Sequence, residues 1–483
     1  MMATRTIHLL HTNDVHSELQ AFGKLVTPFR DLRNGLLATG ASVLCFDIGD
    51  HVDISHPISA ATSGKVNVEM LQNAGYDAWV PGNNESLMLA PHRLAALREQ
   101  SQIPLLCANV QGCVSHLLYE VGGVTLGVFG VTVYFPLLHD CLHSGVTEPI
   151  AAAWRVTQML RAKGADVVVM LSHLGFAADQ ALADGLAVDV ILGGHSHHFL
   201  SEAVQRSNTW ICQAGKYAQA FGHTVLHLEQ DGGRVSVRDV SSTLIYSAPS
   251  EVMDRGISGV LMREAKAAQA WLDETIVQIA QPLPHSVLGE SVLANILCDE
   301  LRTSTGSDLA LINGGIIAGC LRQGELRRRD LLANCPSPMR AVVCVLSGRE
   351  ILQIVSEAWY GELAERRGFG FGFRGYLIGL LHLSGGHVTL SGEDSETGVT
   401  IKHLVIADQP LALTRSYRVA ICEFVALSHV RSVLGDLQYA YYPEMLRDVY
   451  ARGLSKAQAV AQGRTRRYRL QPGVLSHHRL REE

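Results

Sequence analysis

The sequence has no excess of basic residues, since 40 Lys and Arg stand against 46 Asp and Glu, giving a net charge of −6. Proteins that bind nucleic acids neutralise phosphates with basic surface patches. The charge balance therefore argues against nucleic acid as a partner. The hydrophobic fraction of 47% and the charged fraction of 18% are typical of a globular chain with a sizeable core.

The sequence also lacks a CxxC pair. Its ten cysteines are scattered through apolar segments, at positions 45, 107, 113, 141, 212, 298, 320, 335, 344 and 422. A chain of 483 residues can build a core without disulfides. The first residues, MMATRTIHLLHTND, have neither the long apolar segment nor the small-residue cleavage pattern of an export signal. We therefore expect reduced thiols and a cytoplasmic protein.

An uninterrupted apolar run of membrane-spanning length is missing as well. Two uncharged stretches, residues 121–139 and 375–392, approach that length, but glycine, proline or histidine interrupts each of them. Both are expected to form buried strands and turns. No membrane partner is expected.

The first half of the chain alternates β-rich runs with amphipathic helical stretches, which is the pattern of an α/β fold. Six runs end in a polar or glycine-rich cluster: residues 6–14, 42–50, 76–84, 124–132, 165–175 and 188–198. Strands that deliver such clusters to one edge of a sheet form the usual ligand site of α/β proteins. The first half is therefore expected to hold the chemistry.

The pattern changes near residue 247. From there to Pro282, apolar residues spaced by three and four predict a connecting helix that Pro282 and Pro284 stop. A second block mixes a predicted helix at 292–303 with predicted strands at 308–313, 341–346 and 417–421. We expect domains at residues 1–246 and 283–483 with a linker at 247–282.

Histidine and acidic residues gather at the ends of the predicted strands. Asp14 and His16 lie two positions apart after the first strand, and His195 and His197 repeat this spacing after the last. Side chains two positions apart on an extended segment point the same way, so each pair can approach one ion. The full set comprises Asp14, His16, Asp50, Asn83, His173, His195 and His197. These ligand types predict a metal site.

Asp50 has a special place in this set, because a carboxylate has two acceptor oxygens and can bridge two cations. The site could therefore be dinuclear. Other histidines lack the repeated context and are expected to be structural: His51, His56, His139, His143 and His198.

Five motifs follow one another in the first 198 residues: HTNDVH (11–16), FDIGD (46–50), GNNE (82–85), LSHLG (171–175) and GGHSH (193–197). The series closely resembles the calcineurin-like metallophosphatases, and specifically the two-domain 5′-nucleotidase family. The segments GESVLANILCDELR (289–302) and DLALINGG (308–315) resemble the substrate-domain signature of that family. The GNNE form resembles a leaderless bacterial branch of it.

This resemblance implies a fold and a site. The fold would be an N-terminal four-layer αββα calcineurin-like domain followed by a C-terminal α+β substrate-binding domain. One ion would be held by Asp14, His16, Asp50 and His197, and the other by Asp50, Asn83, His173 and His195. Two such ions, of Mn, Zn, Fe or Co, would lie about 3.5–4 Å apart and supply hydroxide for attack on phosphorus.

The sequence departs from the family at the position after Asn83. The family motif usually has a His there and an Asp three residues later, where this chain has Asn84 and Leu87. An amide can donate a hydrogen bond to a phosphoryl oxygen but cannot deliver a proton, a role typically worth about 10²–10⁴-fold in rate. The resemblance therefore implies a catalytic role for Asn84 beside Asp50, and substrates with good leaving groups would be affected least.

The second half departs further from the family. Asn313 is retained, but Ala318 occupies the usual Arg position, and CPSPM (335–339) replaces a Phe-containing loop. Arg374 could contact phosphate and Phe371 could stack on a base; Arg322, Arg340, Phe369 and Phe373 are alternatives. Asn313, Arg374 and Phe371 are thus the candidate substrate-binding residues.

The leading interpretation is a dinuclear metal-dependent phosphohydrolase that cleaves nucleotide-like phosphate esters, in the manner of a 5′-nucleotidase of nucleotide catabolism. Its partner would be a small-molecule nucleotide or phosphoester. Two alternatives stay open: a nucleotide-sugar or cyclic-nucleotide phosphodiesterase, and a weakly active, metal-containing nucleotide-binding protein. The sequence leaves the oligomeric state open.

Overall fold

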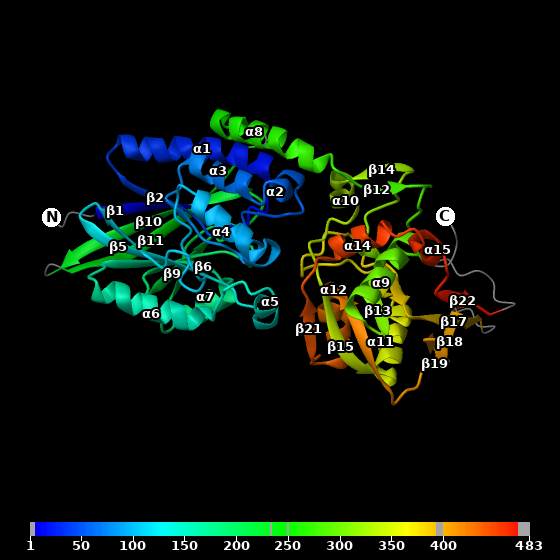
Figure 1. Cartoon of the computed structure of the whole chain (residues 1–483). Helices are drawn as coiled ribbons and strands as arrows, with labels where there is room; N and C mark the ends of the chain where they lie inside the picture. Colours follow the sequence, from blue (N-terminus) through cyan, green and yellow to red (C-terminus); the bar gives the residue numbers. More distant parts are fainter. Residues whose placement is uncertain (1–4, 232–233, 249–250, 393–398, 472–483) are drawn as a thin grey trace. The chain divides into compact units, whose positions relative to one another are not determined.

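The structure is a computed structural model that describes residues 5–231, 234–248, 251–392 and 399–471 (Figure 1). The chain divides into two compact units, Met1–Gln269 and Ala270–Glu483. Each unit has its own sheets and its own core, so each is described by itself.

The first unit contains two mixed sheets. The five-stranded sheet has the order β11-β10-β1-β2-β3, and the six-stranded sheet has the order β4-β5-β6-β7-β9-β8. The strands of the first sheet are β1 (Arg5–Thr12), β2 (Ser42–Asp47), β3 (Ala78–Trp79), β10 (Ala220–Asp231) and β11 (Arg234–Tyr246). Those of the second are β4 (Leu117–Val121), β5 (Val124–Thr132), β6 (Val167–His173), β7 (Val190–Gly193), β8 (Val204–Arg206) and β9 (Thr209–Gln213).

Helices cover the outer face of each sheet. They are α1 (Leu19–Ala38), α2 (Pro57–Ala61), α3 (Lys65–Ala74), α4 (Pro91–Gln100), α5 (Pro136–Cys141), α6 (Pro149–Ala162), α7 (Phe176–Ala183) and α8 (Arg255–Leu272), with a short π-helical turn η1 (Asn84–Met88). Buried residues of α1 recur at spacings of three and four, as in Leu19, Phe22 and Val26, because one stripe of the helix faces the sheet.

The cores show that the first unit has four layers. One apolar cluster joins the inner faces of the two sheets, with Leu9 and Phe46 from one and Val128 and Val169 from the other. A second cluster packs α1, α3 and α8 on the first sheet, and a third packs α6 and α7 on the second. The resulting order of layers is helix, sheet, sheet, helix.

The strands that carry the motifs run parallel to one another within each sheet. β1 pairs with β2 and β2 with β3, while β5 pairs with β6 and β6 with β7. All seven residues of β6 are buried, as expected for a central parallel strand covered on both faces. The carboxyl ends of these strands therefore open at a common edge in each sheet.

The connecting helix is shorter than the sequence predicts. Helix α8 ends at Leu272, and residues Thr275–Ile279 form strand β12 instead of continuing the helix. Four of these five residues, Thr275, Ile276, Val277 and Ile279, are β-branched, and the strand pairs with β14 (Gly324–Arg327). Long-range pairing thus decides a segment whose apolar spacing is compatible with a helix.

The second unit is built on a five-stranded sheet of order β16-β13-β20-β15-β21 and a four-stranded sheet of order β19-β18-β17-β22. Their strands are β13 (Leu309–Asn313), β15 (Ala341–Ser347), β16 (Leu381–Ser384), β17 (Gly386–Gly392), β18 (Val399–Ile406), β19 (Gln409–Pro410), β20 (Ser416–Cys422), β21 (Tyr439–Tyr442) and β22 (Tyr468–Leu470). The helices are α9 (Val292–Thr305), α10 (Arg328–Asn334), α11 (Gly348–Tyr360), α12 (Glu423–Val425), α13 (Arg431–Leu434), α14 (Leu446–Leu454) and α15 (Ala459–Gly463), with short turns η2 (Gly314–Ile316), η3 (Leu363–Glu365) and η4 (Ala426–Val430).

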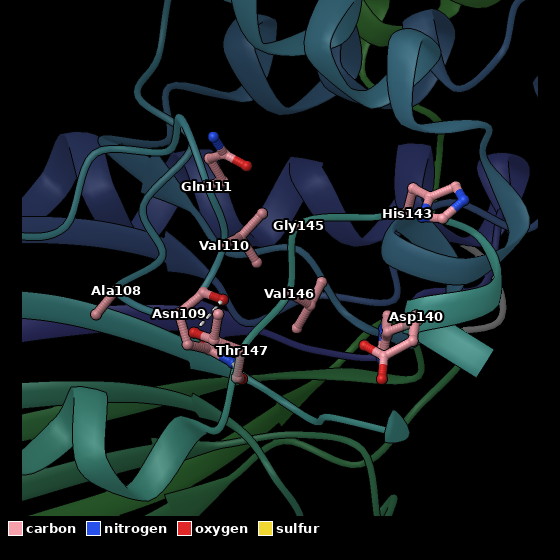
Figure 2. A pocket seen from close by; sticks show the side chains of 10 residues that line it. Ala108, Asn109, Val110, Gln111, Asp140, His143, Gly145, Val146 and Thr147 are labelled. Atoms are coloured by element: carbon pink, nitrogen blue, oxygen red, sulfur yellow. Dashed lines mark hydrogen bonds between the residues drawn. The ribbon is translucent and has the colours of Figure 1, made fainter. Parts of the chain in front are cut away.

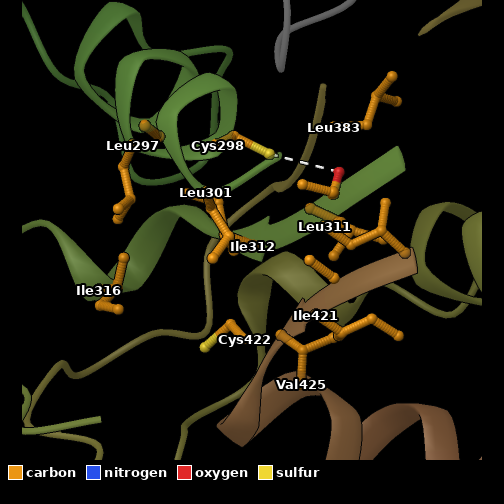
Figure 3. Close-up of a cluster of buried hydrophobic side chains, with 14 of the residues drawn as sticks. Leu297, Cys298, Leu301, Leu311, Ile312, Ile316, Leu383, Ile421, Cys422 and Val425 are labelled. Carbon is orange, nitrogen blue, oxygen red and sulfur yellow. Dashed lines mark hydrogen bonds between the residues drawn. The ribbon is translucent and has the colours of Figure 1, made fainter. Parts of the chain in front are cut away.

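Helix α9 shows why the second unit folds as its sequence predicts. The Ser291 side chain accepts a hydrogen bond from Ala294 N at the start, and Gly306 ends the helix in a left-handed conformation. The inner face of α9 carries Leu297 and Leu301 into the apolar cluster of this unit, where they meet β13 and β20 (Figure 3).

No helix in the described part of the chain is both long enough and apolar enough to cross a membrane. None of the ten cysteines is in a disulfide, and seven of them are buried.

Candidate metal centre

The predicted ligands follow the carboxyl ends of β1, β2, β3, β6 and β7. Five of them have a positive φ although none is glycine: Asp14 (53°), His16 (49°), Asp50 (51°), His195 (70°) and His197 (60°). The left-handed conformation costs non-glycine residues roughly 1–3 kcal/mol, and such residues cluster at functional sites. The strained loops therefore mark this edge as the functional site of the unit.

Backbone hydrogen bonds hold these loops against each other. Asp14 N donates to Gly49 O at 2.9 Å, and His16 N donates to Asp50 O at 2.8 Å. His195 N donates to the Asp14 carboxylate at 2.9 Å, which joins the two sheets at the site. The loop of Gly82 packs so closely against Asp50 that a Cβ on residue 82 would lie 2.1 Å from Asp50 Oδ1. Only glycine fits at this position. The side chains are thus placed by backbone contacts.

Asp14, His16 and His197 form the first group of ligand atoms. His16 Nε2 lies 3.1 Å from His197 Nε2, and His197 Nε2 lies 3.4 Å from Asp14 Oδ1. All three ligand atoms lie within 4.8 Å of one another, so they can surround one ion. The pair Asp14 and His16 lies together in this group, whereas only His197 of the second pair joins it, so the spacing of His195 and His197 does not bring both to one ion.

Asp14, Asp50 and His173 form the second group. Asp50 Oδ1 lies 3.4 Å from His173 Nε2, and its other oxygen, Oδ2, lies 3.9 Å from His16 Nε2. The two oxygens of Asp50 are therefore directed at histidines of different groups. Asn83 Oδ1 lies 3.3 Å from His173 Nε2. His195 is outside both groups, but its ring centre is 5.2 Å from that of His173.

The chemistry of these donors fits divalent cations. Asp14 and Asp50 are buried, and among the described residues their only ion-pairing partners are histidines rather than Lys or Arg. A buried carboxylate is costly unless positive charge compensates it. Imidazole nitrogens facing each other beside these carboxylates offer the lone pairs that such ions bind.

Asp50 and His173 stabilise each other's charged forms. Burial opposes the charged form of both Asp50 and His173, yet their mutual attraction raises the pKa of His173 to about 10 and holds the pKa of Asp50 well below its ordinary value. Burial and the neighbouring His173 lower the pKa of His195 to about 4. Asp50 is therefore an anion, His173 an imidazolium that would release its proton when an ion binds, and His195 a neutral imidazole at physiological pH.

Asn84 has a different position from the one expected of a phosphoryl contact. Its side chain is buried, and its amide nitrogen lies 3.0 Å from His16 Nδ1 and 2.9 Å from Val52 O. Its backbone N–H donates to Asp50 Oδ1 at 2.7 Å. The Asn84 amide nitrogen thus contacts the Nδ1 side of His16, while His16 Nε2 faces the other ligands. Leu87 is buried.

Glu85 is a residue of the site that the sequence analysis did not single out. Its buried carboxylate accepts hydrogen bonds from Asp50 N at 3.1 Å, Gly82 N at 2.7 Å and Val52 N at 2.7 Å. Burial and the Asp50 carboxylate raise its pKa to about 7. Glu85 therefore ties the Asp50 loop to the loop that carries Asn83. The sequence signal that could have identified Glu85 is its position as the last residue of the GNNE motif.

Asn13 and Tyr217 were also missed. The Asn13 amide donates to Asp14 Oδ2 at 2.7 Å and to Gly215 O at 2.6 Å, and Tyr217 N donates to Asp14 O at 2.8 Å. The Tyr217 ring lies edge-on to His16, with 5.5 Å between ring centres. Because Tyr217 lies 201 positions after His16 in the sequence, only the folded structure reveals this contact.

The candidate substrate residues of the second unit differ in exposure. Asn313 is fully buried, and its amide donates to Ile378 O at 2.8 Å, so it supports a loop instead of facing a ligand. Phe373 is buried and stacks on Phe424 at 4.6 Å between ring centres. Phe371 and Arg374 are exposed on the same loop. Of the three phenylalanines considered for stacking on a base, Phe369 and Phe371 are thus exposed to solvent and Phe373 is not.

Among the remaining alternatives, Arg340 is buried and donates to Pro443 O at 2.9 Å, which identifies it as a structural residue. Arg322 is exposed.

A cavity of about 660 Å³ is lined by residues 108–111 together with residues of the 139–147 segment, none of which is a predicted metal ligand (Figure 2). Its main polar side chain, Asn109, is satisfied internally by Thr132 and Thr147. His139 is buried and accepts a hydrogen bond from Phe135 N. Asn109 and His139 thus support the local fold around this cavity.

Comparisons with known proteins agree with the geometry. A family model for calcineurin-like phosphoesterases matches residues 7–199, and one for the C-terminal domain of 5′-nucleotidases matches residues 274–433. The chain belongs to the two-domain 5′-nucleotidase family. As a member of the 5′-nucleotidase family it is a phosphoester hydrolase, and the predicted family and mixed α/β fold are both confirmed.

Relatives of this 5′-nucleotidase family member match nearly end to end. The uncharacterized metallophosphoesterase YunD of Bacillus subtilis is 28% identical over 459 residues, which covers 92% of this chain and 98% of YunD. The structure of a 5′-nucleotidase precursor from Thermus thermophilus has a TM-score of 0.56 at 21% identity, covering 97% and 100% of the two chains. That of the NAD nucleotidase NadN from Haemophilus influenzae has a TM-score of 0.65 at 13% identity, with the same coverage. These two structures share the fold.

Asp179 lies under the site and gives a prediction about pH. It is fully buried, its Oδ1 accepts a hydrogen bond from Ser172, and Oδ2 has no partner among the described residues. Burial raises its pKa to about 7. Between these two pKa values the folded protein keeps the proton of Asp179, whereas the unfolded chain, in which the pKa is about 3.9, releases it. Asp179 should lower stability as the pH rises from about 4 to about 7, with no further change above that.

Asp179→Asn is expected to remove this pH dependence. Relative to the native protein, the variant should gain on the order of 2–4 kcal/mol between pH 5 and pH 8, since a shift of about three pKa units acts on a fully buried group. Thermal denaturation at several pH values checks it. Melting temperatures that stay parallel across this range would contradict the prediction.

Proposed function

We propose that the chain is a dinuclear metal-dependent phosphohydrolase that cleaves nucleotide-like phosphate esters. The observation that carries the proposal is the arrangement of Asp50, whose two carboxylate oxygens are directed at His173 and His16 in two different ligand groups. A bridging carboxylate between two such groups is the arrangement that two neighbouring ions require.

The proposed ligands are those expected from the motifs. Asp14, His16, Asp50 and His197 would hold one ion, and Asp50, Asn83, His173 and His195 the other. Bound Mn, Zn, Fe or Co ions would supply Lewis-acid stabilisation of the phosphoryl group and a water of lowered pKa. The protein's own part is to fix the ligand positions through strained loops and to keep Asp50 ionised.

Asn84 is proposed to position ligands, because its amide contacts His16 Nδ1 and its backbone N–H contacts Asp50 Oδ1. Residues that hold the far side of a metal ligand commonly tune affinity about 10–100-fold. No general acid is assigned to this position, which favours esters with good leaving groups. Nucleotide sugars, whose pyrophosphate linkage supplies such a leaving group, are therefore a second candidate substrate, and cyclic nucleotides are proposed beside them as the other diester class.

For the second unit, we propose that Arg374 and Phe371 contact substrate, since both side chains are exposed on one loop. Residues 283–483 would form the substrate domain, residues 1–246 the metal-binding domain, and residues 247–282 the link between them. A cytoplasmic location is proposed because none of the ten cysteines is in a disulfide, as expected in a reducing compartment.

A phosphoester panel tests the proposed function. Protein supplied with Mn²⁺ or Zn²⁺ should hydrolyse p-nitrophenyl phosphate and 5′-nucleotides, and chelation should stop the reaction. Comparing monoesters with diesters separates the two substrate candidates. Full metal occupancy without turnover of any ester would instead favour the nucleotide-binding protein.

A further inference from the structure

Two histidines of the first unit meet on its first sheet, outside the candidate metal centre. His8 Nδ1, on β1, lies 2.9 Å from His223 Nε2, on β10, and the two ring centres are 5.2 Å apart. Both side chains are half-buried. Among the described residues, no other side chain forms a hydrogen bond or an ion pair with either ring. Each imidazole is therefore the polar partner of the other.

The backbone fixes the distance between these rings. β1 and β10 are antiparallel neighbours, joined by seven consecutive residue pairs (Figure 1). Leu10 lies opposite His223, and His8 lies two positions earlier on the same face, so the two histidines are diagonal neighbours. His8 is four residues from the end of β1, or roughly 13 Å along the strand. The pair is therefore separate from the ligands that follow that end.

The distance between the facing nitrogens suits one ion held by two imidazoles. At Zn–N distances of about 2.0–2.1 Å, two nitrogens bound to the same ion lie roughly 2.9–3.4 Å apart. The pair His16 and His197 of the candidate metal centre has the same ring-centre distance, 5.2 Å, and facing nitrogens 3.1 Å apart. A rotation of the rings about χ2 aims the two lone pairs at a common ion. Imidazole nitrogens suit Zn²⁺, Cu²⁺ and Ni²⁺, whereas Mn²⁺ prefers oxygen ligands.

Both rings are neutral at physiological pH and can bind an ion without releasing a proton to solvent. Burial and the charge of His227 lower the pKa of His8, and burial and the charge of His8 lower the pKa of His223. One of the two facing nitrogens carries the proton of their hydrogen bond. In a neutral imidazole this proton can move to the other nitrogen of the same ring, His8 Nε2 or His223 Nδ1, which frees both facing lone pairs.

We propose that His8 and His223 bind one transition-metal ion with a preference for imidazole, such as Zn²⁺, in a structural site of their own. Water molecules complete the coordination of the ion. The bound ion joins β1 to β10 and so stabilises the sheet whose strands lead to the candidate metal centre. This site does not depend on ester hydrolysis, so it can be tested even if the proposed function fails.

The zinc content of the protein tests the proposal. Native protein and variants are equilibrated at the same concentration of free Zn²⁺, and the bound zinc is measured by elemental analysis. His8→Ala and His223→Ala should each hold one zinc ion fewer per chain than the native protein. His8→Gln and His223→Gln should show the same loss with a smaller change in side-chain volume, so they decide the matter if the Ala variants do not fold.

Two controls make the comparison specific. His227→Gln changes a third histidine on the same face, opposite Thr6, whose Nε2 lies 2.9 Å from Ser241 Oγ. This variant should hold as much zinc as the native protein. With Mn²⁺ in place of Zn²⁺, the native protein and the variants of His8 and His223 should bind equal amounts of metal, because Mn²⁺ prefers oxygen ligands.

Thermal denaturation gives a second measurement, because an ion that binds only the folded protein stabilises it. Relative to each metal-free protein, Zn²⁺ should raise the melting temperature of the native protein more than that of His8→Gln, whereas Mn²⁺ should raise both equally. An unchanged zinc content in either His8→Gln or His223→Gln, or an equal loss of zinc in His227→Gln, would overturn the proposal. Equal stabilisation of the native protein and His8→Gln by Zn²⁺ would also overturn it.

Discussion

Asp50→Asn is expected to abolish phosphoester hydrolysis, lowering kcat/KM by about 10³-fold or more. The change removes one negative charge and one of two oxygens directed at His173 and His16. A bound ion supplies several kcal/mol of transition-state stabilisation, and about 1.4 kcal/mol corresponds to a factor of ten in rate. Elemental analysis should show loss of metal in parallel with loss of activity.

Asp77→Asn is the matched control for this prediction. Asp77 is a partly buried carboxylate of the same unit, accepts a hydrogen bond from Cys45 N and precedes β3, at the opposite end of the strand from Asn83. This variant should keep metal and activity. An Asp50→Asn protein that retains both metals and normal turnover would remove Asp50 from the bridging role.

The ends of the motif-bearing strands could be predicted because their causes are local. Asp14 and His16, like His195 and His197, come directly after the apolar runs that form β1 and β7, so the sequence alone places them at strand ends. The loops, and not the period of a strand, then orient their side chains, since all four residues have a positive φ. Alternation of strands and helices then brings the parallel carboxyl ends to one edge. Short-range pattern and a general rule of α/β topology were sufficient.

Contacts between distant segments could not be predicted in this way. The position of Asn84 behind His16 depends on the π-helical turn Asn84–Met88, which turns the side chain toward Val52. Tyr217 reaches His16 only because β10 pairs with β1 and returns the preceding loop to the end of β1. Neither arrangement leaves a periodic signal in the sequence.

The early end of the connecting helix has a similar cause. Residues Thr275–Ile279 have apolar spacing that suits either a helix or a strand, and pairing with β14 selects the strand. Asn313 illustrates the same limit for function, because its motif does not reveal that the side chain is buried and bonded to Ile378. Burial is a property of the whole fold.

Glu85→Ala is expected to cost the first unit about 3–5 kcal/mol of unfolding free energy. The substitution leaves the N–H groups of Asp50, Gly82 and Val52 without their acceptor in a buried site, and each unsatisfied group costs about 1–3 kcal/mol. Denaturant unfolding of the full chain, with chelator present so that ligand binding does not contribute, checks the value for the transition of this unit.

Glu85→Gln separates the role of the oxygen from the role of the charge. The Gln carbonyl can take the place of Oε2, which accepts from Asp50 and Gly82, but its NH₂ group would then face Val52 N–H. We expect a loss between those of the native protein and the Ala variant. An Ala variant as stable as the native protein would contradict the role of Glu85. A Gln variant as unstable as Ala would mean that all three hydrogen bonds act as one unit, so that the loops of Asp50 and Asn83 are held in place together.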